Sequence, residues 1–138
     1  MNKVEKYTSW TLIDNQPKKM IVDGLHDDEA GLRILLKGAS ESDESLLLQV
    51  LFDSYISYRN MDESYRAGTF DNYPEGLSDT FYTVSKSTWL DWFHKESKNI
   101  YNDRGIIHYS IITVADCIDI LSEFPPDVSW IKKCKRSF

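Results

Sequence analysis

The sequence predicts an α+β domain, in which a mainly antiparallel sheet of about five to six strands carries two helices packed on one face. Two observations lead to this fold class. Short segments with alternating apolar and polar residues recur along the chain and are rich in aromatic and β-branched side chains, as strands are. Two other segments have apolar residues at helical spacing, and each begins at a threonine followed by an aspartate three positions later, which is typical of a helix start.

The N-terminal third is predicted to contain three strands. Residues 7–13 alternate and are aromatic and β-branched, and residues 20–22 form a short apolar segment. Residues 32–37 are ambiguous, because the acidic residues before them and Gly38 after them suit a helix, whereas their alternation suits a strand. We favour a strand, because the polar run 40–45 can then join it to the next apolar segment as a hairpin.

The longest alternating segment covers residues 46–58 and predicts one long strand in the centre of the sheet. Its buried face would hold an apolar set, namely Leu46, Leu48, Val50, Phe52, Ile56 and Tyr58. Its other face would display a polar set, namely Gln49, Asp53, Tyr55, Ser57 and Arg59. The strand would lead into a charged loop over residues 60–66, an arrangement typical of a recognition surface.

The C-terminal half is predicted to alternate between strands and helices after an exposed, turn-rich excursion over residues 67–80. Strands are expected at residues 81–84, 106–112 and 128–131, the last of them at a sheet edge. A first helix would begin at Thr88 and a second at Thr113. The second helix has four apolar residues on one face, namely Val114, Cys117, Ile118 and Leu121. A right-handed crossover around the first helix would allow one parallel strand pair.

Length and charge describe one acidic domain. The 138 residues are enough for a single globular unit over residues 1–138, with a basic C-terminal tail over residues 132–138. The chain has 22 acidic and 16 basic residues, so its net charge is −6; the tail contributes +4, which leaves −10 for residues 1–131. An acidic body disfavours nucleic acid as a direct ligand and favours a basic protein partner, although acidity also serves solubility alone.

Several classes of function find no support in the sequence. The three histidines and two cysteines lack the spacing of a metal site, and there is no phosphate-binding glycine loop or nucleophile motif. We therefore expect no cofactor, no metal and no enzymatic activity. No apolar run is long enough to span a membrane and the N-terminus lacks an apolar signal-peptide segment, so we expect a cytoplasmic protein without membrane contact.

The candidate partner-binding residues fall into two groups. The first lies at the end of the long strand and in the loop after it, and consists of Asp53, Tyr55, Arg59, Asp62, Glu63, Tyr65 and Arg66. Tyrosine and arginine dominate the binding energy of many interfaces, which favours a protein partner. The second group is a carboxylate stripe on the solvent face of the second helix, formed by Asp116, Asp119 and Glu123. The alternatives are a structural ion network for the first group and an ordinary wet helix face for the second.

Two segments carry a resemblance to a known class of protein. The segment FDSYISYRNMDESYR and the C-terminal segment WLDWFHKESKNIYNDRGIIHYSIITVADCIDILSEFPPDVSW resemble small bacterial immunity proteins of contact-dependent inhibition and other polymorphic toxin systems, over residues 30–131. The resemblance implies a non-catalytic antitoxin that binds one cognate toxin domain, often a basic nuclease. It assigns no role to any individual residue.

We expect such an immunity protein to be a monomer or a weak homodimer. Two other hypotheses for the function remain. One is a homodimeric regulatory or adaptor protein without enzymatic activity. The other is an enzyme with a site around Asp53, Arg59, Asp62 and Glu63, which would require a deep pocket with perturbed carboxylates at those positions.

Overall fold

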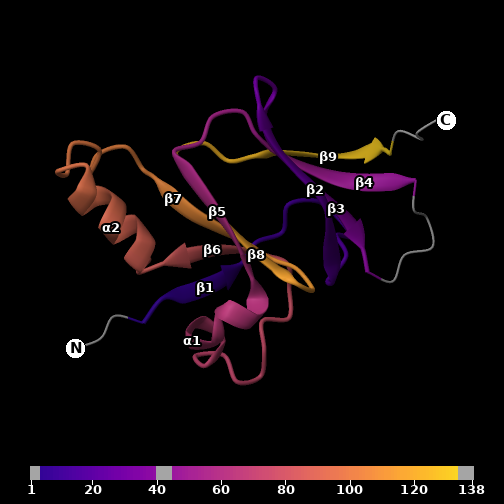
Figure 1. Ribbon diagram of the computed structural model, residues 1–138, viewed down its shortest axis with the longest axis horizontal. Coiled ribbons are helices and arrows are strands. Elements are labelled where there is room, and N and C mark those ends of the chain that lie inside the picture. The colour runs from indigo at the N-terminus through magenta and orange to yellow at the C-terminus, as the bar shows by residue number, and fades with distance from the viewer. Residues whose placement is uncertain (1–3, 40–44, 134–138) are drawn as a thin grey trace.

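The computed structural model describes residues 4–39 and 45–133, and these residues form two antiparallel sheets and two helices (Figure 1). The five-stranded sheet has the order β1 (Lys6–Ser9), β6 (Phe81–Ser85), β7 (Ile107–Ile112), β8 (Asp116–Ser122) and β5 (Ser57–Asp62). The four-stranded sheet has the order β2 (Met20–Asp28), β3 (Gly31–Gly38), β4 (Leu46–Phe52) and β9 (Asp127–Lys132). The predicted α+β class is confirmed, with the strands divided between two sheets.

The main core lies between the two sheets. In β3, the residues Leu32, Ile34 and Leu36 are fully buried and alternate with partly exposed neighbours, which confirms the strand predicted there. They pair with the buried residues of β4, so both strands turn their apolar side chains to the same face. The opposite sheet contributes a matching set, namely Phe81, Tyr109, Ile111, Ile118 and Ile120. The predicted hairpin connection over residues 40–45 lies almost entirely outside the described residues.

The prediction of one long strand over residues 46–58 is wrong. Strand β4 ends at Phe52, and the chain bends through residues 53–56 before β5 begins in the other sheet. Alternation of side chains cannot show such a change of sheet, because both strands keep the same period. The first half is a central strand, between β3 and β9, whereas β5 is an edge strand beside β8. Ile56, predicted to be buried, is 37% exposed at the bend.

The prediction of a second helix from Thr113 is also wrong, because this segment is strand β8. Both faces of β8 are covered, so apolar residues occur on each and the period of two is lost. The threonine and aspartate that resemble a helix cap instead close the turn between β7 and β8. Thr113 N donates to Asp116 O at 2.8 Å, and Asp116 N donates to Thr113 Oγ at 3.0 Å.

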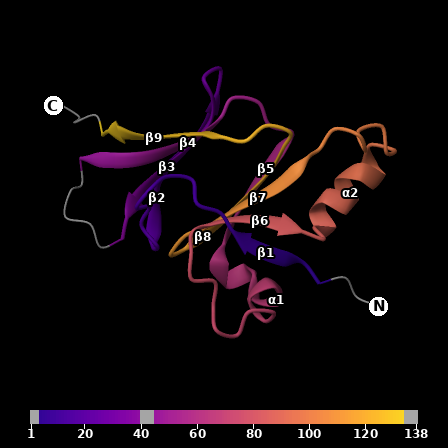
Figure 2. The same ribbon diagram turned by 180° about the vertical axis from the view of Figure 1, so that it is seen from behind.

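The helices flank the five-stranded sheet. Helix α2 (Thr88–Glu96) confirms the first predicted helix, although its N-cap is Ser87 rather than Thr88. The short helices η1 (Glu63–Tyr65) and α1 (Ala67–Phe70) were not predicted. Figures 1 and 2 place α1 and α2 beside the five-stranded sheet and apart from β2, β3, β4 and β9. Neither helix in the described ranges is long and apolar enough to cross a membrane.

The remaining strand predictions are confirmed with changed bounds. Strand β1 is shorter than predicted, β2 is longer, and β9 lies at a sheet edge as expected. Strands β6 and β7, on either side of α2, pair antiparallel, as does every strand pair within the described residues. The parallel pair that a crossover would have allowed is therefore not formed there. Residues 134–138 of the predicted basic tail lie outside the described part of the chain.

Candidate functional site

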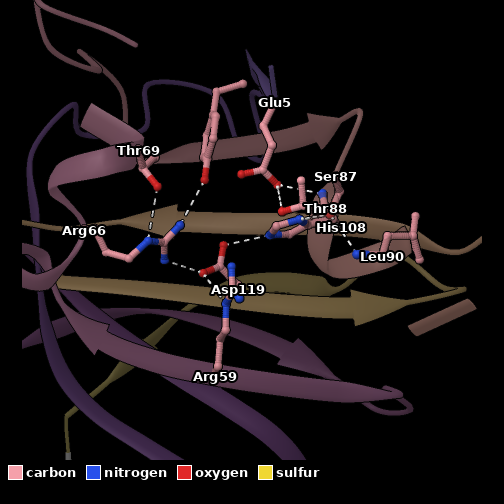
Figure 3. A network of polar contacts seen from close by, with 10 residues as sticks. Glu5, Arg59, Arg66, Thr69, Ser87, Thr88, Leu90, His108 and Asp119 are labelled. Carbon is pink, nitrogen blue, oxygen red and sulfur yellow. Dashed lines mark hydrogen bonds and ion pairs between the residues drawn. The ribbon is translucent and has the colours of Figure 1, made fainter. Parts of the chain in front are cut away.

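A buried carboxylate on the outer face of the five-stranded sheet organises the site. Asp119 lies on β8 and is fully buried. Its Oδ2 accepts from Arg66 Nη1 at 2.8 Å and from Arg59 Nε at 3.1 Å, and its Oδ1 lies 2.7 Å from His108 Nε2 (Figure 3). The position of Arg59 follows from strand pairing, because Arg59 on β5 is directly opposite Asp119.

The same chain of contacts continues from the sheet into α2. Ser87 Oγ lies 2.7 Å from His108 Nδ1 and accepts from Leu90 N at 3.0 Å, so this hydroxyl caps the helix and contacts the imidazole. The imidazole of His108 therefore joins the hydroxyl of Ser87 to the carboxylate of Asp119 through its two ring nitrogens. We call Arg59, Arg66, Ser87, His108 and Asp119 the Asp119 network.

The charges of this network are unequal. Burial opposes ionisation of Asp119, but the hydrogen bond and electrostatic interaction with His108, together with the charges of Arg59 and Arg66, outweigh it and hold the pKa of this carboxyl well below its usual range. Two guanidinium groups therefore face one carboxylate. Arg66 is buried and also donates to Tyr7 Oη at 3.1 Å, whereas the Arg59 side chain is 38% exposed.

Aromatic rings enclose both ends of the network. The guanidinium carbon of Arg59 lies 4.4 Å from the ring centroid of Trp89, within the range of a cation–π contact. The same Trp89 ring meets His108 edge to face at 5.3 Å. Burial, with a further effect of Asp119, raises the pKa of Tyr7 to about 12, so this hydroxyl stays protonated beside Arg66. The first turn of α2 thus closes the network from outside the sheet.

The order Ser87, His108, Asp119 is that of the proton relay in serine hydrolases, and a pocket of about 400 Å³ lies against Ser87 and His108. Three features favour a structural role instead. The ring nitrogens are reversed, since the serine meets Nδ1 and the carboxylate meets Nε2. The serine hydroxyl is buried and already caps α2. The carboxylate is neutralised by two arginines, which weakens its support for a protonated imidazole.

An exposed turn projects from the network. We call residues 62–66 the recognition turn, because it combines acidic side chains with an aromatic ring. Asp62 Oδ1 accepts from Ser64 N at 2.9 Å and Ser64 Oγ at 2.7 Å, and these bonds lower the pKa of Asp62. Glu63 N donates to Ala115 O at 2.9 Å. Tyr65 is 78% exposed, while the next residue, Arg66, is buried on Asp119.

The other predicted site residues are dispersed. Asp53 is exposed at the bend after β4, and the hydroxyl of Tyr55 donates to Asp27, which raises the pKa of Tyr55 to about 12. Glu123 lies 3.5 Å from Arg104. The solvent-facing stripe predicted for Asp116, Asp119 and Glu123 is wrong, because the segment is a strand and its middle carboxylate is buried.

The sequence predicts Arg59, Arg66 and Asp119 as candidate site residues. It does not predict Ser87 and His108, which link these three residues to α2. Ser87 directly precedes the apolar stripe of the helix, so a capping serine was a signal available in the sequence. His108 gave no signal, because one histidine in an apolar strand is indistinguishable from a core residue. Within residues 4–39 and 45–133, no group of three or more histidine, cysteine or carboxylate side chains could hold a metal ion.

Comparisons with known proteins give no matching family model, no matching curated protein and no matching solved structure.

Proposed function

We propose that this chain is a non-catalytic immunity protein that neutralises a cognate bacterial toxin domain by binding it through the recognition turn. The observation that carries the proposal is Tyr65, an aromatic ring 78% exposed on a turn whose last residue, Arg66, is fixed in a buried ion network. Tyrosine is among the residue types that contribute most to binding at interfaces.

Rigidity of the turn supports this function. Association has to offset the entropy of ordering the binding segment, so a segment that is already ordered binds more tightly. The backbone of Glu63 is held by Ala115, and the Arg66 side chain is held by Asp119 and Tyr7. The turn that carries Tyr65 is therefore held at Glu63 and at Arg66 before any partner arrives.

Charge indicates the kind of partner. Asp62 and Glu63 are both exposed directly before Ser64, and the whole chain has a net charge of −6. A complementary partner is basic, as toxin nucleases are, because complementary fields accelerate encounter and fix orientation.

The experiment is co-expression with the candidate toxin domain encoded immediately upstream, followed by measurement of protection and binding. We expect Tyr65→Ala to weaken binding about 30-fold or more, which corresponds to about 2 kcal/mol. The matched control is Trp92→Ala, which removes a 55%-exposed aromatic ring from α2 and should leave binding unchanged.

Two outcomes would contradict the proposal. One is the absence of binding and protection with the native chain. The other is a stable homodimer in solution that Tyr65→Ala dissociates, since the recognition turn would then serve self-association, as in a homodimeric regulatory protein.

A further inference from the structure

A pocket of about 860 Å³ adjoins the recognition turn. It lies between helix α1 with the loop after it and the turn that joins β7 to β8, and Glu63 belongs to its lining. This volume is within the range of sites that enclose small ligands or several side chains of a partner.

The lining of the pocket is mainly apolar. Its apolar part is formed by side chains from the loop and from the β7–β8 turn, namely Phe70, Tyr73, Pro74, Leu77, Ile112 and Val114. Backbone and side-chain bonds hold these elements in place. Tyr73 Oη accepts from Tyr7 N at 2.7 Å, Gly76 N donates to Tyr73 O at 2.8 Å, and Val114 N donates to Met20 O at 3.0 Å. The pocket is therefore formed before any ligand enters.

The charged groups of the pocket are unbalanced. Glu63, Asp71 and Asp79 contribute three carboxylates, against one cation, Lys19. Asp79 Oδ2 accepts from Ser9 Oγ at 2.7 Å. Glu63 and Asp71 form no ion pair with any residue in the described ranges, so both can receive a cation from outside.

We propose that this pocket binds a basic peptide segment of the toxin, in which an arginine or lysine lies next to an apolar residue. The proposal rests on the proposed function and adds a second contact beside Tyr65. The cation would meet Glu63 and Asp71, while the neighbouring apolar side chain and the aliphatic stem of the basic residue would pack on Phe70 and Leu77.

The pocket can be tested without the toxin. The probe is a blocked peptide, acetyl-Gly-Arg-Leu-Arg-Gly-amide, titrated into the isotopically labelled protein and followed by amide NMR. We expect shifts concentrated at Gly76, Thr113 and Val114. A peptide with citrulline in place of both arginines has the same shape without the charge, and it should bind at least tenfold more weakly.

Substitutions in the protein test whether the peptide binds in this pocket. The double variant Glu63→Gln, Asp71→Asn should weaken binding of the arginine peptide about tenfold or more. The matched double variant Glu96→Gln, Asp103→Asn removes two exposed carboxylates that do not line the pocket, and it should bind as the native chain does. Equal binding of the citrulline peptide, or shifts outside the pocket, would overturn the proposal. Agmatine binding as tightly as the peptide would do the same, because it would show a site for small cations.

The two proposals can fail separately. Neutralisation of the toxin by the Glu63→Gln, Asp71→Asn variant at native affinity would overturn the role of the pocket and leave the proposed function intact. Peptide binding at the pocket without protection against any upstream-encoded domain would overturn the immunity function and leave the pocket as a site for basic segments.

Discussion

Arg59 and Arg66 contact the same carboxylate oxygen but differ in burial. Arg66 is 8% exposed and donates to Asp119, Tyr7 and Thr69, so three groups depend on its position. Arg59 contributes one bond at 3.1 Å and remains 38% exposed, where solvent screens its charge. The two residues should therefore differ in their effect on stability.

We expect Arg66→Met to lower the free energy of unfolding by about 3 kcal/mol, at the low end of the range for breaking a buried ion pair, because Asp119 keeps Arg59 and His108. The matched variant Arg59→Met should cost about 1 kcal/mol or less. Urea unfolding of both variants with unchanged m-values measures the difference. Equal losses would show that burial does not separate the two arginines.

The sequence could name these residues but not their surroundings. Arg59 and Arg66 were candidates because of their neighbours, and Asp119 because of its spacing from Asp116 and Glu123. Only the pairing of β5 with β8 brings Arg59 and Asp119 together, from positions 60 residues apart. Strand pairing between distant segments depends on the whole fold, so no local pattern in the sequence contains it.

At the scale of elements, contacts of the first turn attach α2 to the sheet. Ser87 caps the helix and contacts His108, and Trp89 covers His108 and Arg59. Glu5, which directly precedes β1, accepts a hydrogen bond from Thr88 N at 3.0 Å. This carboxylate adds a negative charge at the helix N-terminus, which is favourable there.

Removal of the Ser87 hydroxyl should therefore have two effects at once. We expect Ser87→Ala to lower the free energy of unfolding by about 2–4 kcal/mol, from the lost cap and from a buried imidazole nitrogen left without a partner. The control is Ser85→Ala on the exposed end of β6, with an expected change within about 0.5 kcal/mol. Thermal unfolding followed by circular dichroism measures both. A loss no greater than that of the control would mean that Ser87 is not a structural cap.

The helices predicted to begin at Thr88 and at Thr113 show why some elements can be predicted better than others. Helix α2 has one apolar face and a polar one, so its period is visible in the sequence. Strand β8 is buried on both faces, and its apolar residues also match helical spacing. The bend after β4 is concealed for a related reason, because the strands before and after it both alternate. Whether a strand is buried on both faces, and whether the chain passes from one sheet to the other, is decided by the assembly of the layers. Local sequence patterns therefore do not show either property.

At the scale of the whole molecule, the five-stranded sheet is the middle layer. One face packs on the four-stranded sheet through an apolar core, and the other carries the Asp119 network and a second apolar cluster under α1 and its loop. The recognition turn is joined to this middle layer through Arg66. The stability of the layer and the anchoring of the turn that carries Tyr65 therefore depend on the same ionised carboxylate.

This dependence predicts an acid-sensitive fold. The folded state keeps the pKa of Asp119 far below the ordinary value of about 3.9, which applies to the unfolded chain. The contribution of Asp119 is therefore complete above about pH 5 and is lost as the pH falls below about 4, because the unfolded chain then binds a proton that the folded chain does not. The expected slope from this one group approaches about 1.4 kcal/mol per pH unit. Urea unfolding between neutral and acidic pH measures it, and Asp119→Asn should remove that share. If this variant does not fold, ¹³C NMR of the native carboxylate decides, since protonation of Asp119 near pH 4 in the folded state would contradict the prediction.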